Sequence, residues 1–156
     1  MDLKNVIDGC IQMEQTVASI YSMFMQLFPE EKILWEDLLR DETDHALWLT
    51  DANFIGSIDL LPSNDILPSM KQIENSLRFA DNKRMQIKLN PVTMEEALNI
   101  ALKLEETMVE TFANELKANL FASDYRSLSE KLLIAEKLHI DKIEGLMIKK
   151  GFLQLT

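Results

Sequence analysis

Four long segments of the chain carry apolar residues at the spacing of an α-helix, and this periodicity most limits the possible folds. Apolar side chains that recur every three or four positions form one stripe on a helix, which must be buried against other helices. Only four glycines and four prolines occur in 156 residues, of which 47% are hydrophobic. The sequence therefore predicts a single all-α domain over residues 1–156, built as an antiparallel four-helix bundle.

Capping and turn residues give approximate limits for the four helices. We expect them at residues 3–28, 30–55, 93–121 and 124–150. Pro29 and Glu30 form so short a connection that the second helix must run back along the first. Thr93 to Glu96 has the form of a capping box at the start of the third helix, and Gly151 stops the fourth.

The span 56–92 is the least regular part of the chain. It is far longer than an ordinary connection between helices. A helix of about 26 residues is roughly 39 Å long, and a linker of this length can return along it. Residues from Met70 to about Arg84 have a modest helical pattern. We interpret the span as a crossover between the second and third helices, containing a short extra helix packed on the edge of the bundle.

Each of the four apolar stripes is interrupted by a glutamate. Glu14 and Glu105 interrupt the first and third stripes, whereas the second and fourth each contain the motif Glu-x-x-His. The two motifs hold the only histidines of the chain, and they are Glu42 with His45 and Glu136 with His139. Residues three apart on a helix project from the same face, so each motif offers a carboxylate and an imidazole to one point in space.

A four-helix bundle would bring these six side chains together. One glutamate from each of two helices, with Glu-x-x-His from each of the other two, is the ligand set of dinuclear carboxylate sites. Two divalent cations would balance the charge of the four carboxylates, which would otherwise repel one another and bind protons. Carboxylates and imidazoles suit iron and manganese, and zinc can substitute. We predict a site for two Fe ions, and neither haem nor flavin.

Two other interpretations of these residues stay open at this stage. The glutamates and histidines of a metal-free bundle could face solvent or pair as buried ions. A mononuclear site, or a zinc site, could use part of the same set. Tyr21 lies two helical turns after Glu14, where it could hydrogen-bond a ligand carboxylate or sit beside the metals. It could equally be a core aromatic residue with a satisfied hydroxyl group.

Charge and hydropathy exclude several classes of partner. The formal net charge is −10, and no basic stripe is available to neutralise phosphates, so we expect neither nucleic acid nor an anionic membrane as a partner. No apolar run approaches the roughly 20 residues needed to span a bilayer. Residues 1–5 lack the pattern of a secretory signal. The single cysteine, Cys10, excludes an internal disulfide bond, and we expect a cytoplasmic protein.

The six candidate ligands and Tyr21 resemble the ferritin-like superfamily, most closely the rubrerythrin-type single domains. The resemblance covers nearly the whole chain, since the positions that carry it run from Glu14 to His139. It implies a ferritin-like fold, a diiron site, and reactivity with dioxygen or peroxide. Bundles of this type often pair through an outer helix face, so we expect a homodimer.

Two features of the chain differ from the rubrerythrin pattern. Rubrerythrins usually carry a cysteine-rich domain that delivers electrons, and this chain has one cysteine, so an electron-donor protein would have to be external. They also tend to have a further glutamate one turn after the third-helix ligand, where this chain has Met108. The chain thus lacks the extra carboxylate over which an iron could shift during turnover.

The predicted function is that of a non-haem diiron oxidoreductase that reduces peroxide or dioxygen, as a peroxidase or ferroxidase does. The alternative is an iron-binding or iron-handling protein that takes up ferrous iron without multiple-turnover catalysis. A third hypothesis is a helical interaction module without a metal.

Overall fold

The computed structural model describes residues 3–50, 69–107 and 140–153, and within these ranges every regular element is a helix. The elements are α1 (Leu3–Leu27), the 3₁₀ turn η1 (Pro29–Glu31), α2 (Lys32–Thr50), α4 (Met70–Leu89) and α5 (Met94–Glu105), and residues 140–149 are also helical. The all-α class is therefore confirmed. Parts of the expected second, third and fourth helices and of the crossover fall on residues 51–68 and 108–139, outside the described ranges.

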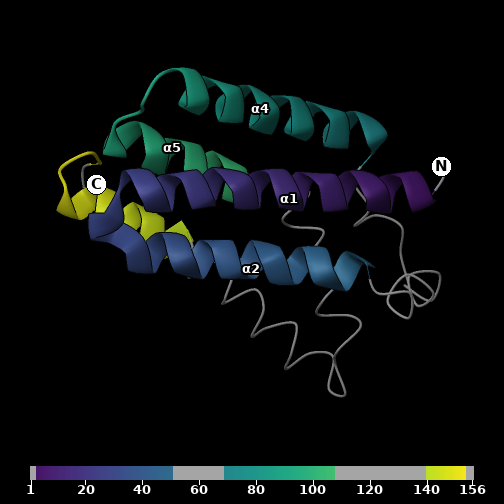
Figure 1. Cartoon of the computed structure of the whole chain (residues 1–156), viewed down its shortest axis with the longest axis horizontal. Coiled ribbons are helices and arrows are strands. Elements are labelled where there is room, and N and C mark those ends of the chain that lie inside the picture. Colours follow the sequence, from purple (N-terminus) through teal and green to yellow (C-terminus); the bar gives the residue numbers. More distant parts are fainter. Residues whose placement is uncertain (1–2, 51–68, 108–139, 154–156) are drawn as a thin grey trace, which may run out of the picture.

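Helices α1 and α2 lie side by side and run in opposite directions (Figure 1). Helix α1 ends before Phe28, whose backbone leaves the helical region at φ −129° and ψ 68°. Pro29 then opens η1, at a position where the missing N–H of proline costs no hydrogen bond. We expected the second helix to begin at residue 30, but a 3₁₀ turn occupies that position and α2 begins at Lys32.

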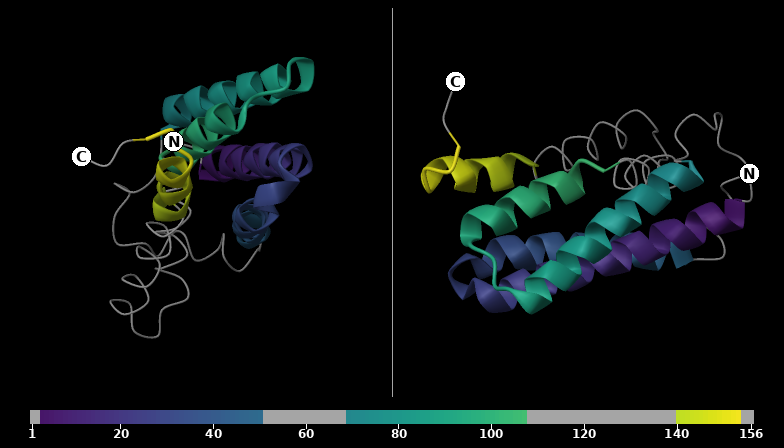
Figure 2. Two further views of the ribbon diagram at one scale, coloured as in Figure 1. Left: turned by 90° about the vertical axis from the view of Figure 1, so that its left-hand side faces the viewer. Right: turned by 90° about the horizontal axis from the view of Figure 1, so that it is seen from above.

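Helix α4, within the expected crossover, lies along the other side of α1 (Figures 1 and 2). Its first turn is closed by a capping box, in which Ser69 Oγ accepts from the Gln72 N–H at 3.1 Å and the Ser69 N–H donates to Gln72 Oε1 at 2.9 Å. We expected a short helix ending near Arg84, but α4 is 20 residues long. It continues because Ile87, one turn later, extends its buried stripe against α1.

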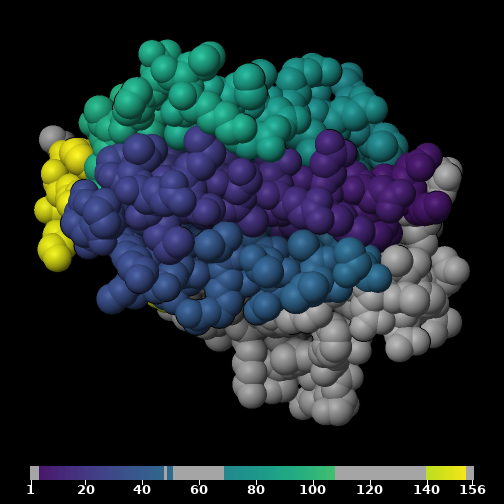
Figure 3. All heavy atoms as spheres, viewed as in Figure 1, coloured from purple at the N-terminus to yellow at the C-terminus, as the bar shows by residue number. Residues whose placement is uncertain are grey.

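A glycine allows α4 to approach α1 closely. A Cβ atom at Gly9 would lie only 2.7 Å from Cγ2 of Ile73, which is fully buried. Real Cβ atoms do not come that close to another carbon, so only glycine fits between the helices in this arrangement. Figure 3 shows the surfaces of α2, α1 and α4 in continuous contact along this face of the molecule.

Helix α5 begins as the sequence predicts and ends earlier. Thr93 is its N-cap, and Thr93 Oγ1 accepts from the Glu96 N–H at 3.1 Å. We expected this helix to continue to residue 121, but α5 ends at Glu105. The reason is local, because both the N–H and the hydroxyl group of Thr107 donate to the carbonyl of Leu104, at 3.2 and 2.9 Å. Such three-residue bonds tighten the last turn and end the helix.

The helical segment 140–149 ends at Gly151, as predicted. Gly151 has φ +81°, the left-handed conformation that glycine adopts without strain. Its N–H donates to the carbonyl of Ile148 at 3.0 Å, and the N–H of Phe152 donates to that of Met147 at 2.8 Å. This pair of bonds is the Schellman motif.

Two ion pairs connect the helical segment 140–149 and the residue after it to α2 and to η1. Lys142 Nζ lies 3.4 Å from Asp37 Oδ2, and Lys150 Nζ lies 3.4 Å from Glu31 Oε1. Both pairs are partly exposed, so each adds on the order of 0–1 kcal/mol to stability. They specify the position of the segment more than they stabilise it.

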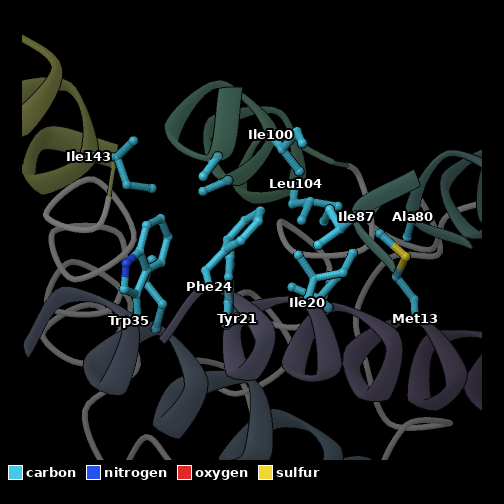
Figure 4. Packing of buried hydrophobic residues seen from close by; sticks show 14 of the residues in the cluster. Met13, Ile20, Tyr21, Phe24, Trp35, Ala80, Ile87, Ile100, Leu104 and Ile143 are labelled. Carbon is cyan, nitrogen blue, oxygen red and sulfur yellow. The ribbon is translucent and has the colours of Figure 1, made fainter. Parts of the chain in front are cut away.

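The core between the helices is rich in aromatic side chains (Figure 4). Tyr21 and Phe24 project from α1 toward α5, and Trp35 of α2 packs on both rings, with centroid distances of 6.3 and 5.0 Å. Ile143, from the segment 140–149, belongs to the same buried cluster. No helix in the described part of the chain combines the length and the apolar character needed to cross a membrane.

Candidate metal centre

Glu14 lies on the buried face of α1, in a position that the helical pattern reserves for an apolar side chain. Its exposed fraction is 0%, and its neighbours on the same face, Cys10 and Val17, are also fully buried. Helix periodicity brings residues three and four positions apart onto one face, and this is why the carboxylate points into the core. The sequence predicted this inward orientation, because Glu14 interrupts an otherwise apolar stripe.

Helix α2 supplies the other two buried polar groups. Glu42 and His45 are one turn apart on the face that also carries Trp35 and Leu49, and their exposed fractions are 1% and 6%. The pairing of α2 with α1 explains why they lie opposite Glu14. In an antiparallel helix pair, the sequence numbers of two residues that face each other add up to the same value along the pair. That total is 59 both for Phe24 packed on Trp35 and for Glu14 in contact with His45.

The three side chains converge closely. Each offers one potential ligand atom, and these atoms all lie within 4.8 Å of one another. Within the group, His45 Nδ1 lies 3.5 Å from Glu14 Oε2. Ligands about 2.1 Å from an ion are at most about 4.2 Å apart. Side-chain movements of less than about 1 Å would therefore let all three bind one ion.

Two carboxylates buried this close together require compensation. Each loses its hydration, and the like charges repel, so the pair is stable only with a nearby cation or with bound protons. A divalent cation would satisfy both carboxylates and the imidazole at once. The donor set of two oxygens and one nitrogen suits the intermediate metals iron, manganese and zinc. The residues present thus fit a metal ion.

Glu105 is buried on α5, as predicted, and lies close to Tyr21. Its exposed fraction is 3%, and Tyr21 Oη donates a hydrogen bond to Glu105 Oε1 at 2.8 Å. Tyr21 therefore combines two roles that the sequence left as alternatives, because its hydroxyl group binds a candidate ligand and its ring is fully buried in the core. Glu105 is not among the three residues whose ligand atoms cluster within 4.8 Å.

The remaining two predicted ligands, Glu136 and His139, lie outside the described residues. Of the six predicted side chains, the structure thus brings together Glu14, Glu42 and His45, and it buries Glu105 on a third helix. The three clustered residues correspond to one half of the predicted dinuclear site.

Trp35 is a neighbour of the site that sequence reasoning placed on the α2 stripe without assigning it any role. It is fully buried beside Tyr21, and its Nε1 has no hydrogen-bond acceptor in the described part of the chain. Only tertiary packing reveals its contact with Tyr21. No local sequence signal could have found it.

Comparison of the chain with known protein families, with curated proteins and with solved structures gave no match. The chemistry of the site therefore has to be inferred from its own residues.

Proposed function

We propose that the chain binds two iron ions in its helical core and uses them to reduce peroxide or dioxygen. The observation that supports this most strongly is the convergence of Glu14, Glu42 and His45, all buried, within 4.8 Å of one another. In this proposal they hold one ion. Glu105, with Glu136 and His139, would hold the second, in the ferritin-like arrangement that the sequence resembles.

The ligand set is suited to redox chemistry rather than to a purely structural metal. A pair of iron ions, when bound, supplies the electrons and the Lewis acidity for reducing an O–O bond. Four carboxylates balance the charge of two divalent cations, and they can change their mode of coordination as the charge rises. The imidazole of His45 is the less variable ligand, because it offers a single ring nitrogen to the ion.

The protein side chains around the ligands orient them and exclude water. Tyr21 holds Glu105 through the 2.8 Å hydrogen bond, which limits the directions in which this carboxylate can turn. The ring of Tyr21 is itself fully buried and packs against Trp35, so its hydrogen bond to Glu105 lies in the apolar core. In such a water-poor environment, electrostatic interactions are stronger than in solvent.

The proposal is tested by peroxide consumption. Protein loaded anaerobically with Fe(II) is mixed with hydrogen peroxide, with and without a chemical reductant. We expect rapid consumption by the wild type and a loss of at least about tenfold in Glu14→Gln, which keeps the shape but removes a charged ligand. Glu36→Gln is the matched control, because Glu36 is an exposed carboxylate on α2. Equal rates in all three proteins would refute the proposal.

The cluster of Glu14, Glu42 and His45 also supports a second candidate function. Glu14, Glu42 and His45 suffice to hold a single ion, as an iron-handling protein would do without turnover. The same assay distinguishes the two functions. Consumption that stops after one equivalent of peroxide per two bound iron ions, even with excess reductant, would indicate iron handling. Sustained consumption would indicate an enzyme.

A further inference from the structure

A groove lies between the beginning of α2 and the helical segment 140–149, which lie beside each other in Figure 1. Its volume is about 360 Å³, and its lining is mostly apolar. The half-buried side chains of Leu34 and Leu146 line it from its two sides, and a Cβ atom at Gly145 would have no other atom within 4 Å. The groove therefore contains an apolar recess with room for a further side chain above Gly145.

Ile33, the residue before Leu34, is also part of this surface. It lines the groove, and 78% of it is exposed, more than any other large apolar residue in the described part of the chain. One exposed apolar residue is ordinary in a protein. Here, however, an exposed apolar side chain and an apolar recess lie on one surface, and such a surface is complementary to a second copy of itself.

The charged residues that line the groove are divided by sign between its two walls. Glu31 and Asp37 come from η1 and α2, whereas Lys142 and Lys149 come from the C-terminal helical segment. Each copy of the chain thus carries an acidic wall beside a basic wall. Because opposite charges attract across an interface, the basic wall of one copy matches the acidic wall of another.

Two exposed charges at one end of the groove have no ion-pair partner among the described residues. They are Glu30, next to Glu31, and Lys149, next to Lys150. Lys150 contacts Glu31 across the groove at 3.4 Å, so the two free charges belong to opposite walls at the same end. The ion pairs within one copy therefore leave one acid and one base available to a partner.

The ion pairs across the groove also show which residues of its two walls are level with each other. Lys150 is level with Glu31, and Lys142 is level with Asp37. Ile33 lies between Glu31 and Asp37 in the sequence, so it is level with the middle of the opposite wall, where the recess lies.

Rotation about a twofold axis parallel to the groove satisfies all these features. It lays the acidic wall of each copy on the basic wall of the other, and it keeps every residue at its own level. We propose that two copies of the chain pair through this groove about such an axis. Ile33 of each copy fills the recess of the other, and Glu30 of each copy pairs with Lys149 of the partner subunit. The sequence alone did not indicate this surface.

The test is sedimentation velocity of the full-length chain over a range of concentrations. At about 0.15 M salt the Debye length is about 8 Å, so the long-range repulsion between copies of net charge −10 is screened. The groove is a small contact, and we expect a monomer–dimer equilibrium with a Kd of about 1–100 µM. A wild-type chain that stays monomeric well above this range would overturn the proposal.

Ile33→Glu tests the apolar contact. It places a charge in the recess of the partner copy, and we expect dimerisation to weaken at least about tenfold. Leu89→Glu is the matched control, because Leu89 is 74% exposed on α4 and does not line the groove. Both positions are exposed, so neither substitution should disturb the fold. Equal weakening by the two substitutions would show that the groove is not the interface.

A charge exchange tests the twofold arrangement itself. Glu30→Lys and Lys149→Glu each bring like charges together at two places in a homodimer, and we expect each variant alone to dimerise at least about fivefold more weakly. An equimolar mixture of the two variants restores both ion pairs in the mixed dimer and should associate as the wild type does. A mixture that associates no better than the separate variants would contradict the proposal. The readout is the mass of the particle and not iron binding, so a negative result leaves the proposed function untouched.

Discussion

Replacing Glu14 with methionine should stabilise the metal-free protein and abolish its stabilisation by metal. Glu14 is fully buried, and its carboxylate lies within 4.8 Å of ligand atoms of Glu42 and His45. Methionine has a similar length and no charge. Removing Glu14 ends its repulsion with Glu42 and the cost of burying its charge, and we expect these gains to exceed the loss of the 3.5 Å contact with His45. Without metal we expect a gain of about 1–3 kcal/mol, or roughly 3–10 °C in the melting temperature.

Metal should offset most or all of this difference in stability. A ligand that binds only the folded state adds about 2.7 kcal/mol of stability at a concentration of 100 times its Kd. The wild type should gain this amount from anaerobic Fe(II), and Glu14→Met should gain much less. Calorimetric and denaturant unfolding with a chelator, and then with Fe(II), measure both effects.

The control for this experiment is Glu36→Met, at an exposed position of α2, which should change stability by no more than about 0.5 kcal/mol in either condition. Our reasoning would be refuted if Glu14→Met were clearly less stable than the wild type without metal. It would also be refuted if Fe(II) stabilised both proteins equally.

Two further predictions concern packing and hydrogen bonding. Gly9→Ala should destabilise the fold by about 1–2 kcal/mol, because overpacking costs about 1–3 kcal/mol and the better helix propensity of alanine returns up to about 1 kcal/mol. Gly145→Ala is the control: it lies in a helical segment, a Cβ atom there would have no atom within 4 Å, and the substitution should stabilise the fold. Equal effects of the two substitutions in denaturant unfolding would contradict the close contact between α1 and α4. Tyr21→Phe should lower the free energy of unfolding by about 1–3 kcal/mol, because it leaves the buried Glu105 without its 2.8 Å hydrogen bond. An unchanged free energy of unfolding would show that this bond is absent in solution.

The elements that the sequence predicted well are those with a strong local signal. Thr93 and Gly151 cap their helices as expected, because capping depends on the properties of single residues. Glu14, Glu42 and His45 were identified because each interrupts an apolar stripe, and burial of all three agrees with that interpretation.

The length of α4 was missed because Arg84 interrupts its apolar stripe. The helix appeared to end there, whereas Ile87 continues the buried face one turn later. The capping box of Ser69 and Gln72 was overlooked in a region interpreted as irregular.

Other features depend on tertiary structure and have no local signal. The contact of Gly9 with Ile73 joins residues 64 positions apart, and it arises only when α4 packs on α1. The early end of α5 depends on which bonds Thr107 makes, and threonine alone does not specify them. Sequence patterns therefore predicted which faces are buried better than where helices end or how closely they pack.

The most direct test of the metal centre is the number of iron ions bound per chain. Metal-free protein is titrated anaerobically with Fe(II), freed of excess metal, and analysed for iron. We predict two ions per chain for the wild type and a loss of at least one ion in a Glu42→Gln, His45→Gln variant. Fewer than one ion per wild-type chain, or the same content in the variant, would contradict it.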